Sequence, residues 1–189
     1  MLLKTKRFLP LMITQFLGAL NDNLFKNALL TLVTVKMTAQ SDILSNLIAG
    51  LFILPFFLFS AMAGQLADKY PRDKIARVLK ITELLLIGVA LAYYRHSLPL
   101  LIVIMTLMGA QSAFFGPVKY ALLPQHLKPE ELIAGNAYIE STTYMAILLG
   151  LILGTLLPIE VTIGLLILLA AVGWLSARQI PPAPSPRPE

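Results

Sequence analysis

Long apolar runs separated by short polar links give this chain its pattern. A helix needs about 20 mostly apolar residues to cross the hydrocarbon core of a bilayer. Six stretches satisfy this requirement, at residues 8–34, 43–67, 76–95, 97–118, 132–157 and 159–177. Because the links are short, we expect consecutive helices to be antiparallel neighbours. The pattern predicts an all-α integral membrane fold, with a six-helix transmembrane bundle over residues 1–178.

The composition favours a bilayer over water. The chain is 57% hydrophobic and only 13% charged, whereas soluble domains carry about 25% charged residues. A net charge of +5 would suggest a nucleic-acid partner in a soluble protein, but no basic face with interleaved aromatic residues is visible. There is no cysteine, and His96 and His126 lie in separate links, so we expect no metal site and no cofactor.

The basic residues predict how the helices are oriented. Lys and Arg are enriched in cytoplasmic loops of membrane proteins. With six spans, twelve of the 15 Lys and Arg residues fall on one side, Lys36 and Arg95 fall on the other, and Lys26 lies within the first span. This distribution predicts that both termini are cytoplasmic.

The first span carries a polar stripe. Gln15, Gly18, Asp22 and Lys26 are three, four and four residues apart, which places them on one face of a helix. Asp22 is expected about 21 Å from the cytoplasmic end at 1.5 Å per residue, and Asn23 is next to it. Ionisable groups at such depth usually face a polar cavity and have a function, so Asp22, Asn23 and Lys26 are candidate substrate residues. Two simpler alternatives are a local Asp22–Lys26 ion pair and a Lys26 that extends to the outer interface.

Two further charged residues are candidates. Lys119 follows Gly116 and Pro117 at the inner end of the fourth span, where it is either a headgroup ligand or an ordinary positive-inside lysine. Glu140 lies about three turns into the fifth span and either pairs with Lys119 or faces the substrate path. Glu83, near the start of the third span, is interpreted as an interfacial charge. No phosphate loop or nucleophile with a base is found, so an enzyme is not expected.

The link after the second span contains the string Gly-Gln-Leu-Ala-Asp-Lys-Tyr-Pro-Arg at residues 64–72. This string resembles the signature between the second and third helices of the major facilitator superfamily, usually G-x-L-x-D-R-x-G-R-x. The matching residues are Gly64, Leu66, Asp68 and Arg72, while Pro71 stands where the family has glycine. The resemblance implies a gating loop, in which Asp68 and Arg72 hold the cytoplasmic gate.

The strings at residues 15–27, 116–120 and 136–154 together resemble a narrower family, the bacterial lysophospholipid transporters. This resemblance implies one half of a twelve-helix major facilitator fold. It also implies energy-independent movement of lysophosphatidylethanolamine from the outer to the inner leaflet of the bacterial inner membrane, where it is re-acylated. By the same resemblance Asp22, Asn23, Lys119 and Glu140 are headgroup and gating residues.

Two other functions stay open. The gating signature is shared across the superfamily, so a small-solute or drug transporter is one alternative. The other is a membrane module of a fused phospholipid acyltransferase, although no H-x-x-x-x-D acyltransferase string occurs here. The proline-rich residues 179–189 predict an extended cytoplasmic linker or tail, interpreted as the central loop of a longer protein. The expected partners are the lysophospholipid, membrane lipid, a second six-helix half and an acyltransferase domain.

Overall fold

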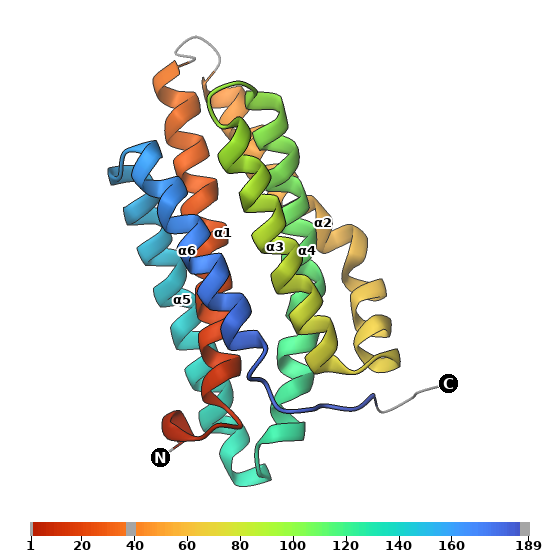
Figure 1. The fold of residues 1–189 in the computed structure, drawn as a ribbon. Coiled ribbons are helices and arrows are strands. Elements are labelled where there is room, and N and C mark those ends of the chain that lie inside the picture. The colour runs from red at the N-terminus through yellow and green to blue at the C-terminus, as the bar shows by residue number, and fades with distance from the viewer. Residues whose placement is uncertain (1, 37–40, 186–189) are drawn as a thin grey trace.

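Six long helices form nearly all of the computed structural model, which describes residues 2–36 and 41–185 (Figure 1). They are α1 (Leu9–Lys36), α2 (Ser41–Lys69), α3 (Arg72–Tyr93), α4 (Leu98–His126), α5 (Leu132–Leu156) and α6 (Ile159–Ala177). Two short 3-10 turns, η1 (Leu2–Lys4) and η2 (Pro129–Glu131), precede α1 and α5. No strand occurs in these described ranges. The predicted all-α six-helix bundle is confirmed, while the last four residues of the predicted tail, 186–189, lie outside the described residues.

Hydropathy alone identifies only part of this bundle. By length and composition, four of the described helices can cross a membrane, namely α2, α4, α5 together with η2, and α6. In α1 the residues Asp22 and Lys26 interrupt the apolar sequence, and the first twelve residues of α3 include six charged ones. The deepest of these are turned inward, since Asp22 is 5% exposed and Lys80 and Glu83 are each 1% exposed. Burial between helices therefore accommodates the charges that lower the hydropathy of α1 and α3.

The first helix of each half of the chain packs against the last two helices of the other half. Helix α1 packs against α5 and α6, and helix α4 packs against α2 and α3 (Figure 1). Across the middle, α3 contacts α6 and α1 contacts α4. The two halves are therefore equivalent: if α1, α2 and α3 are replaced by α4, α5 and α6, and the reverse, the same contacts are obtained. Because successive helices alternate in direction, the two trios are inverted with respect to each other, which is a common architecture of secondary transporters.

Helix α4 is longer than the sequence pattern predicts. The predicted span ends at residue 118, but the helix continues through Pro117 and Pro124 to His126. Buried proline is tolerated in a membrane bundle because neighbouring groups accommodate the backbone. Here Leu122 and Leu123 are 0% and 2% exposed and belong to a core cluster at this end of the bundle. Packing thus keeps the helix continuous, and Lys119 lies inside α4 rather than at its end.

The chain after α6 is extended and runs across the ends of α3 and α4 (Figure 1). The Arg72 amide donates to the Ala183 carbonyl at 2.9 Å, and the Ala183 amide donates to Asp73 Oδ1 at 3.1 Å. Ile180 and Ala183 are each 1% exposed. These contacts fix the segment against the start of α3, next to the predicted gating loop.

Candidate functional site

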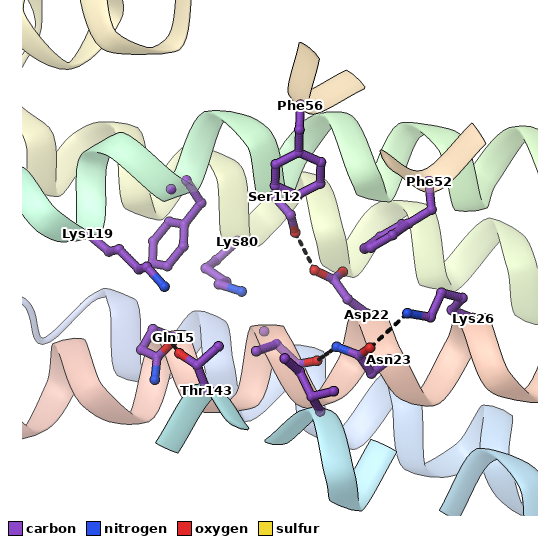
Figure 2. Close-up of a pocket in the computed structure, with 15 residues that line it drawn as sticks. Gln15, Asp22, Asn23, Lys26, Phe52, Phe56, Lys80, Ser112, Lys119 and Thr143 are labelled. Carbon is purple, nitrogen blue, oxygen red and sulfur yellow. Dashed lines mark hydrogen bonds between the residues drawn. The ribbon is translucent and has the colours of Figure 1, made fainter. Parts of the chain in front are cut away.

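A cavity of about 410 Å³ lies between the helices, halfway along α1 (Figure 2). The predicted stripe of α1 lines it in full, from Gln15 to Lys26. Four residues predicted as substrate ligands line it together, namely Asp22, Asn23, Lys26 and Lys119. Phenylalanine side chains from α2 and α4 complete the wall, and these are Phe52, Phe56 and Phe115. The cavity therefore offers charged groups of both signs beside an aromatic surface, which suits an amphipathic ligand.

Asp22 is the acidic group of this cavity. One of its carboxylate oxygens, Oδ2, accepts a hydrogen bond from the Ser112 hydroxyl of α4 (Figure 2). The other, Oδ1, is buried and has no hydrogen-bond partner among the described residues. A buried acceptor without a donor is costly, unless a ligand supplies one. Asp22 is thus positioned to accept from a cationic ligand.

Lys26 does not form the local ion pair with Asp22 that the spacing suggests. Its Nζ donates to Asn23 Oδ1 at 3.0 Å and lies 5.2 Å from the centre of the Phe52 ring (Figure 2). No ion pair joins Asp22 and Lys26 in residues 2–36. Lys26 therefore remains directed along the cavity wall, and the Asp22 carboxylate is left available.

Close packing of α5 on α1 fixes the turn that carries Asn23. A methyl group on Gly150 would lie 2.7 Å from Asn23 Cβ, and one on Gly154 would lie 2.6 Å from the Leu24 carbonyl oxygen. Small residues four apart are typical of such close helix approaches in membranes. On the same pair of helices, Gln15 Oε1 accepts from the Thr143 hydroxyl at 2.9 Å. The position of the α1 turn thus depends on the absence of side chains at Gly150 and Gly154.

A buried ion pair lies beside the cavity. Lys80 Nζ and Glu83 Oε2 are 2.5 Å apart, and both residues are 1% exposed. The Asn21 amide donates to Glu83 Oε1 at 2.9 Å, and the Gln111 amide approaches Oε2 at 3.5 Å. The interpretation of Glu83 as an interfacial charge is wrong, because packing of α1, α3 and α4 encloses it. Lys80, counted with the basic residues of the cytoplasmic side, is likewise inside the bundle and lines the cavity.

The helical register of α3 carries a signal for this pair. Ala76, Lys80, Glu83, Ile87 and Ala90 follow one another at intervals of four and three residues, and all are buried. Such spacing defines one face of a helix. Two ionisable residues on an otherwise apolar stripe indicate an inward-facing polar pair.

Glu140 is separated from the cavity. Its Oε1 accepts a hydrogen bond from the Tyr120 hydroxyl, and it is not part of the cavity lining. The alternative pairing with Lys119 is not formed in the described structure, since Lys119 Nζ lies 4.8 Å from the centre of the Tyr120 ring. Of the five predicted substrate residues, Glu140 is the one that the structure does not bring to the others.

The predicted gating loop lies at the end of the bundle, away from the cavity. Arg72, 8% exposed, donates to the Ala67 carbonyl at 3.0 Å and to the Ala121 carbonyl at 3.1 Å. Its contact with Asp68 is longer, at 3.5 Å, and the Asp68 side chain is 61% exposed. A methyl group on Gly64 would meet no atom within 4 Å. Arg72 thus ties the end of α2 to α4, whereas Gly64 has no close neighbour.

Metal chemistry finds no support in the described ranges, where no cluster of three or more His, Asp or Glu residues is positioned to hold an ion. The ionisable groups that do converge are the Asp22 and Glu83 carboxylates with the lysines of the cavity wall. Such a set binds ligands by charge and hydrogen bonding.

Comparison with known proteins agrees with this architecture. The sequence model of the Major Facilitator Superfamily matches residues 11–189. Among curated proteins, the lysophospholipid transporter LplT of Klebsiella pneumoniae (strain 342) is 30% identical over 98% of this chain, and that of Enterobacter sp. (strain 638) is 29% identical over 92%. LplT of Photorhabdus laumondii subsp. laumondii is 27% identical over 80%. The matches cover 46%, 43% and 36% of these relatives, so the chain spans less than half of their length. With its six-helix membrane bundle and this match over almost all of its length, the chain belongs to the Major Facilitator Superfamily.

Proposed function

We propose that this chain forms one half of a lysophospholipid transporter, a multi-pass protein of the bacterial inner membrane with both termini in the cytoplasm. Its substrate is lysophosphatidylethanolamine, which moves from the outer to the inner leaflet and is re-acylated there. The observation that carries this proposal is the cavity in which the Asp22 carboxylate lies beside lysines and phenylalanines. The printed names of the relatives, lysophospholipid transporters, agree with it.

The headgroup and the cavity have complementary charges. Asp22 Oδ1, which has no partner in the described chain, accepts from the ammonium group of ethanolamine. Lys119 and Lys26 provide positive charge for the phosphate, and Asn23 positions Lys26 through their hydrogen bond. Phe52 and Phe56 line the same cavity and provide an apolar surface for the glycerol and the start of the acyl chain. Buried charges of both signs on one wall match a zwitterion better than an apolar drug.

The remaining predicted residues act at the gate. Arg72 ties the end of α2 to α4. The cytoplasmic end opens when these hydrogen bonds break, and Asp68 and Gly64 belong to the same gating loop. Glu140, held by the Tyr120 hydroxyl, is a contact between α4 and α5 rather than a headgroup ligand. A second six-helix half closes the cavity, and an acyltransferase, fused or separate, consumes the product. The chain itself is a transporter component and not an enzyme.

The test is uptake of labelled lysophosphatidylethanolamine by the full-length protein in proteoliposomes. We expect Asp22→Asn to abolish uptake at normal expression, because the neutral amide does not attract an ammonium group. Glu160→Gln is the matched control, since Glu160 is an exposed carboxylate in an exposed pair with Arg95. Uptake of lysophosphatidylglycerol, which lacks the ammonium group, should be affected less. Full uptake by Asp22→Asn would refute the assignment.

A further inference from the structure

Lys80 reaches the cavity beside Gly18 of α1, where no side chain is in the way. It belongs to α3, yet its Nζ occupies the space beside Gly18, where a methyl group would overlap it. The ammonium group also lies 5.2 Å from the centre of the Phe115 ring. Lys80 therefore reaches from α3 to the face of α1 that carries Gly18 and ends at the cavity wall (Figure 2). Glycine at position 18 is what makes this path possible.

The Lys80 ammonium group has unused hydrogen-bonding capacity. An ammonium carries three donors, and Glu83 is the one hydrogen-bond acceptor that Nζ has among the described residues. A buried cation is stable only when its donors are satisfied. Lys80 also lies close enough to Asp22 for an electrostatic interaction. The free donors are thus available beside the carboxylate assigned to the ligand's ammonium group.

Glu83, in contrast, is held from three helices. Its two oxygens accept from Asn21 of α1 and Lys80 of α3, with the longer contact to Gln111 of α4. Asn21 is 0% exposed and Gln111 is 4% exposed. If Lys80 turns away, two amide donors stay on the carboxylate. The amides of Asn21 and Gln111 can therefore keep Glu83 in place if Lys80 changes partner.

We propose that Lys80 binds the phosphate of the lysophospholipid headgroup and that Glu83 is the positioning residue that holds Lys80 while the cavity is empty. This inference rests on the proposed transport function and adds to it the residue that exchanges a carboxylate for a phosphate. An anionic phosphate replaces the Glu83 oxygen as acceptor and uses the two remaining donors. The ammonium of the same headgroup then meets Asp22, so both ends of the zwitterion are bound on one wall.

The variants separate phosphate binding from simple neutralisation of Glu83. In the full-length protein, Lys80→Gln should raise the KM for lysophosphatidylethanolamine uptake about tenfold or more, which is the equivalent of one charged hydrogen bond. Lys80→Arg should keep most of the affinity. Glu83→Gln should lower the KM, because the lysine is then released to the ligand. The double variant, Lys80→Gln with Glu83→Gln, removes both charges of the buried pair together and should fold, yet its KM should stay raised. A double variant with the wild-type KM would overturn the inference.

A steric variant tests the same point without changing any charge. Gly18→Ala displaces the Lys80 ammonium group and should raise the KM, whereas Gly88→Ala, whose methyl group meets no atom within 4 Å, should not. An unchanged KM in Gly18→Ala contradicts the role of Lys80.

Equilibrium binding of labelled lysolipid to the purified protein, with inorganic phosphate as competitor, tests the phosphate site at Lys80 separately from the proposed transport function. Competition that Lys80→Gln abolishes, in a protein without uptake, would refute transport but support the phosphate site. Absence of phosphate-sensitive binding in the wild type would refute the phosphate site. Uptake without any dependence on Lys80 would refute the inference alone.

Discussion

The approach of α5 to α1 gives the most direct physical prediction. In Gly154→Ala the added Cβ would lie 2.6 Å from the Leu24 carbonyl oxygen and 2.9 Å from Asn27 Cβ, whereas ordinary contacts begin at 3.4 Å. Since the carbonyl belongs to the α1 backbone, no side chain can rotate away, and the helices must separate by about 0.8 Å. Overpacking of this kind costs about 1–3 kcal/mol.

The matched control is Gly164→Ala on α6. Its methyl group meets no atom within 4 Å, but it gains the same helix propensity of about 1 kcal/mol that alanine has over glycine. The difference in unfolding free energy between the two variants therefore isolates the contact. We expect Gly154→Ala to be less stable than Gly164→Ala by about 1–3 kcal/mol.

The assay is unfolding of the full-length protein by SDS in mixed micelles, followed by circular dichroism. Uptake of lysophosphatidylethanolamine should fall as well in Gly154→Ala, because the displaced turn, from Leu24 to Ala28, carries Lys26 and directly follows Asp22 and Asn23. Equal stability of the two variants, within about 0.5 kcal/mol, would show that α1 and α5 are not in close contact, and the reasoning on site geometry would fail.

Three further changes test individual contacts. Ser112→Ala removes the donor to Asp22 and should lower the unfolding free energy by about 1.5–3 kcal/mol, while uptake should suffer less than in Asp22→Asn. Arg72→Lys should lower the melting temperature, because one ammonium cannot span the carbonyls that the guanidinium joins; an unchanged melting temperature would contradict this. Glu131→Gln weakens a partly exposed two-bond contact with Arg7, in which both distances are 2.6 Å. Its small effect on stability should vanish at high salt, and an effect that persists there would indicate a different cause.

The bundle and the α1 part of the site were accessible from sequence for a common reason. Long apolar runs leave few alternatives to membrane helices, and a carboxylate such as Asp22 within one of them requires a polar neighbour. The spacing of Gln15, Asp22 and Lys26 then fixed a single face, which the structure places on the cavity.

What escaped prediction depends on contacts between helices. Counting basic residues by side treats Lys80 like any loop lysine, and Glu83 then follows as an interfacial charge, although the register of α3 turns both inward. The partner of Glu140 is decided by which side chain α4 presents, and this proved to be Tyr120 rather than Lys119. Sequence spacing orders residues along one helix, but it does not state how two helices rotate against each other.

The extended segment after α6 has a mechanical consequence for the loop it touches. Besides its backbone contacts with the start of α3, it receives the Gln125 amide on the Pro184 carbonyl at 2.9 Å, and Ser185 donates to the Asp68 carbonyl at 2.9 Å. The segment thus lies across the ends of α2, α3 and α4 and connects these three helices by non-covalent contacts. We expect that α2 cannot slide against α4 unless this segment first loses its hydrogen bonds to both helices. Detachment of the segment and movement of the α2–α3 turn should therefore occur together.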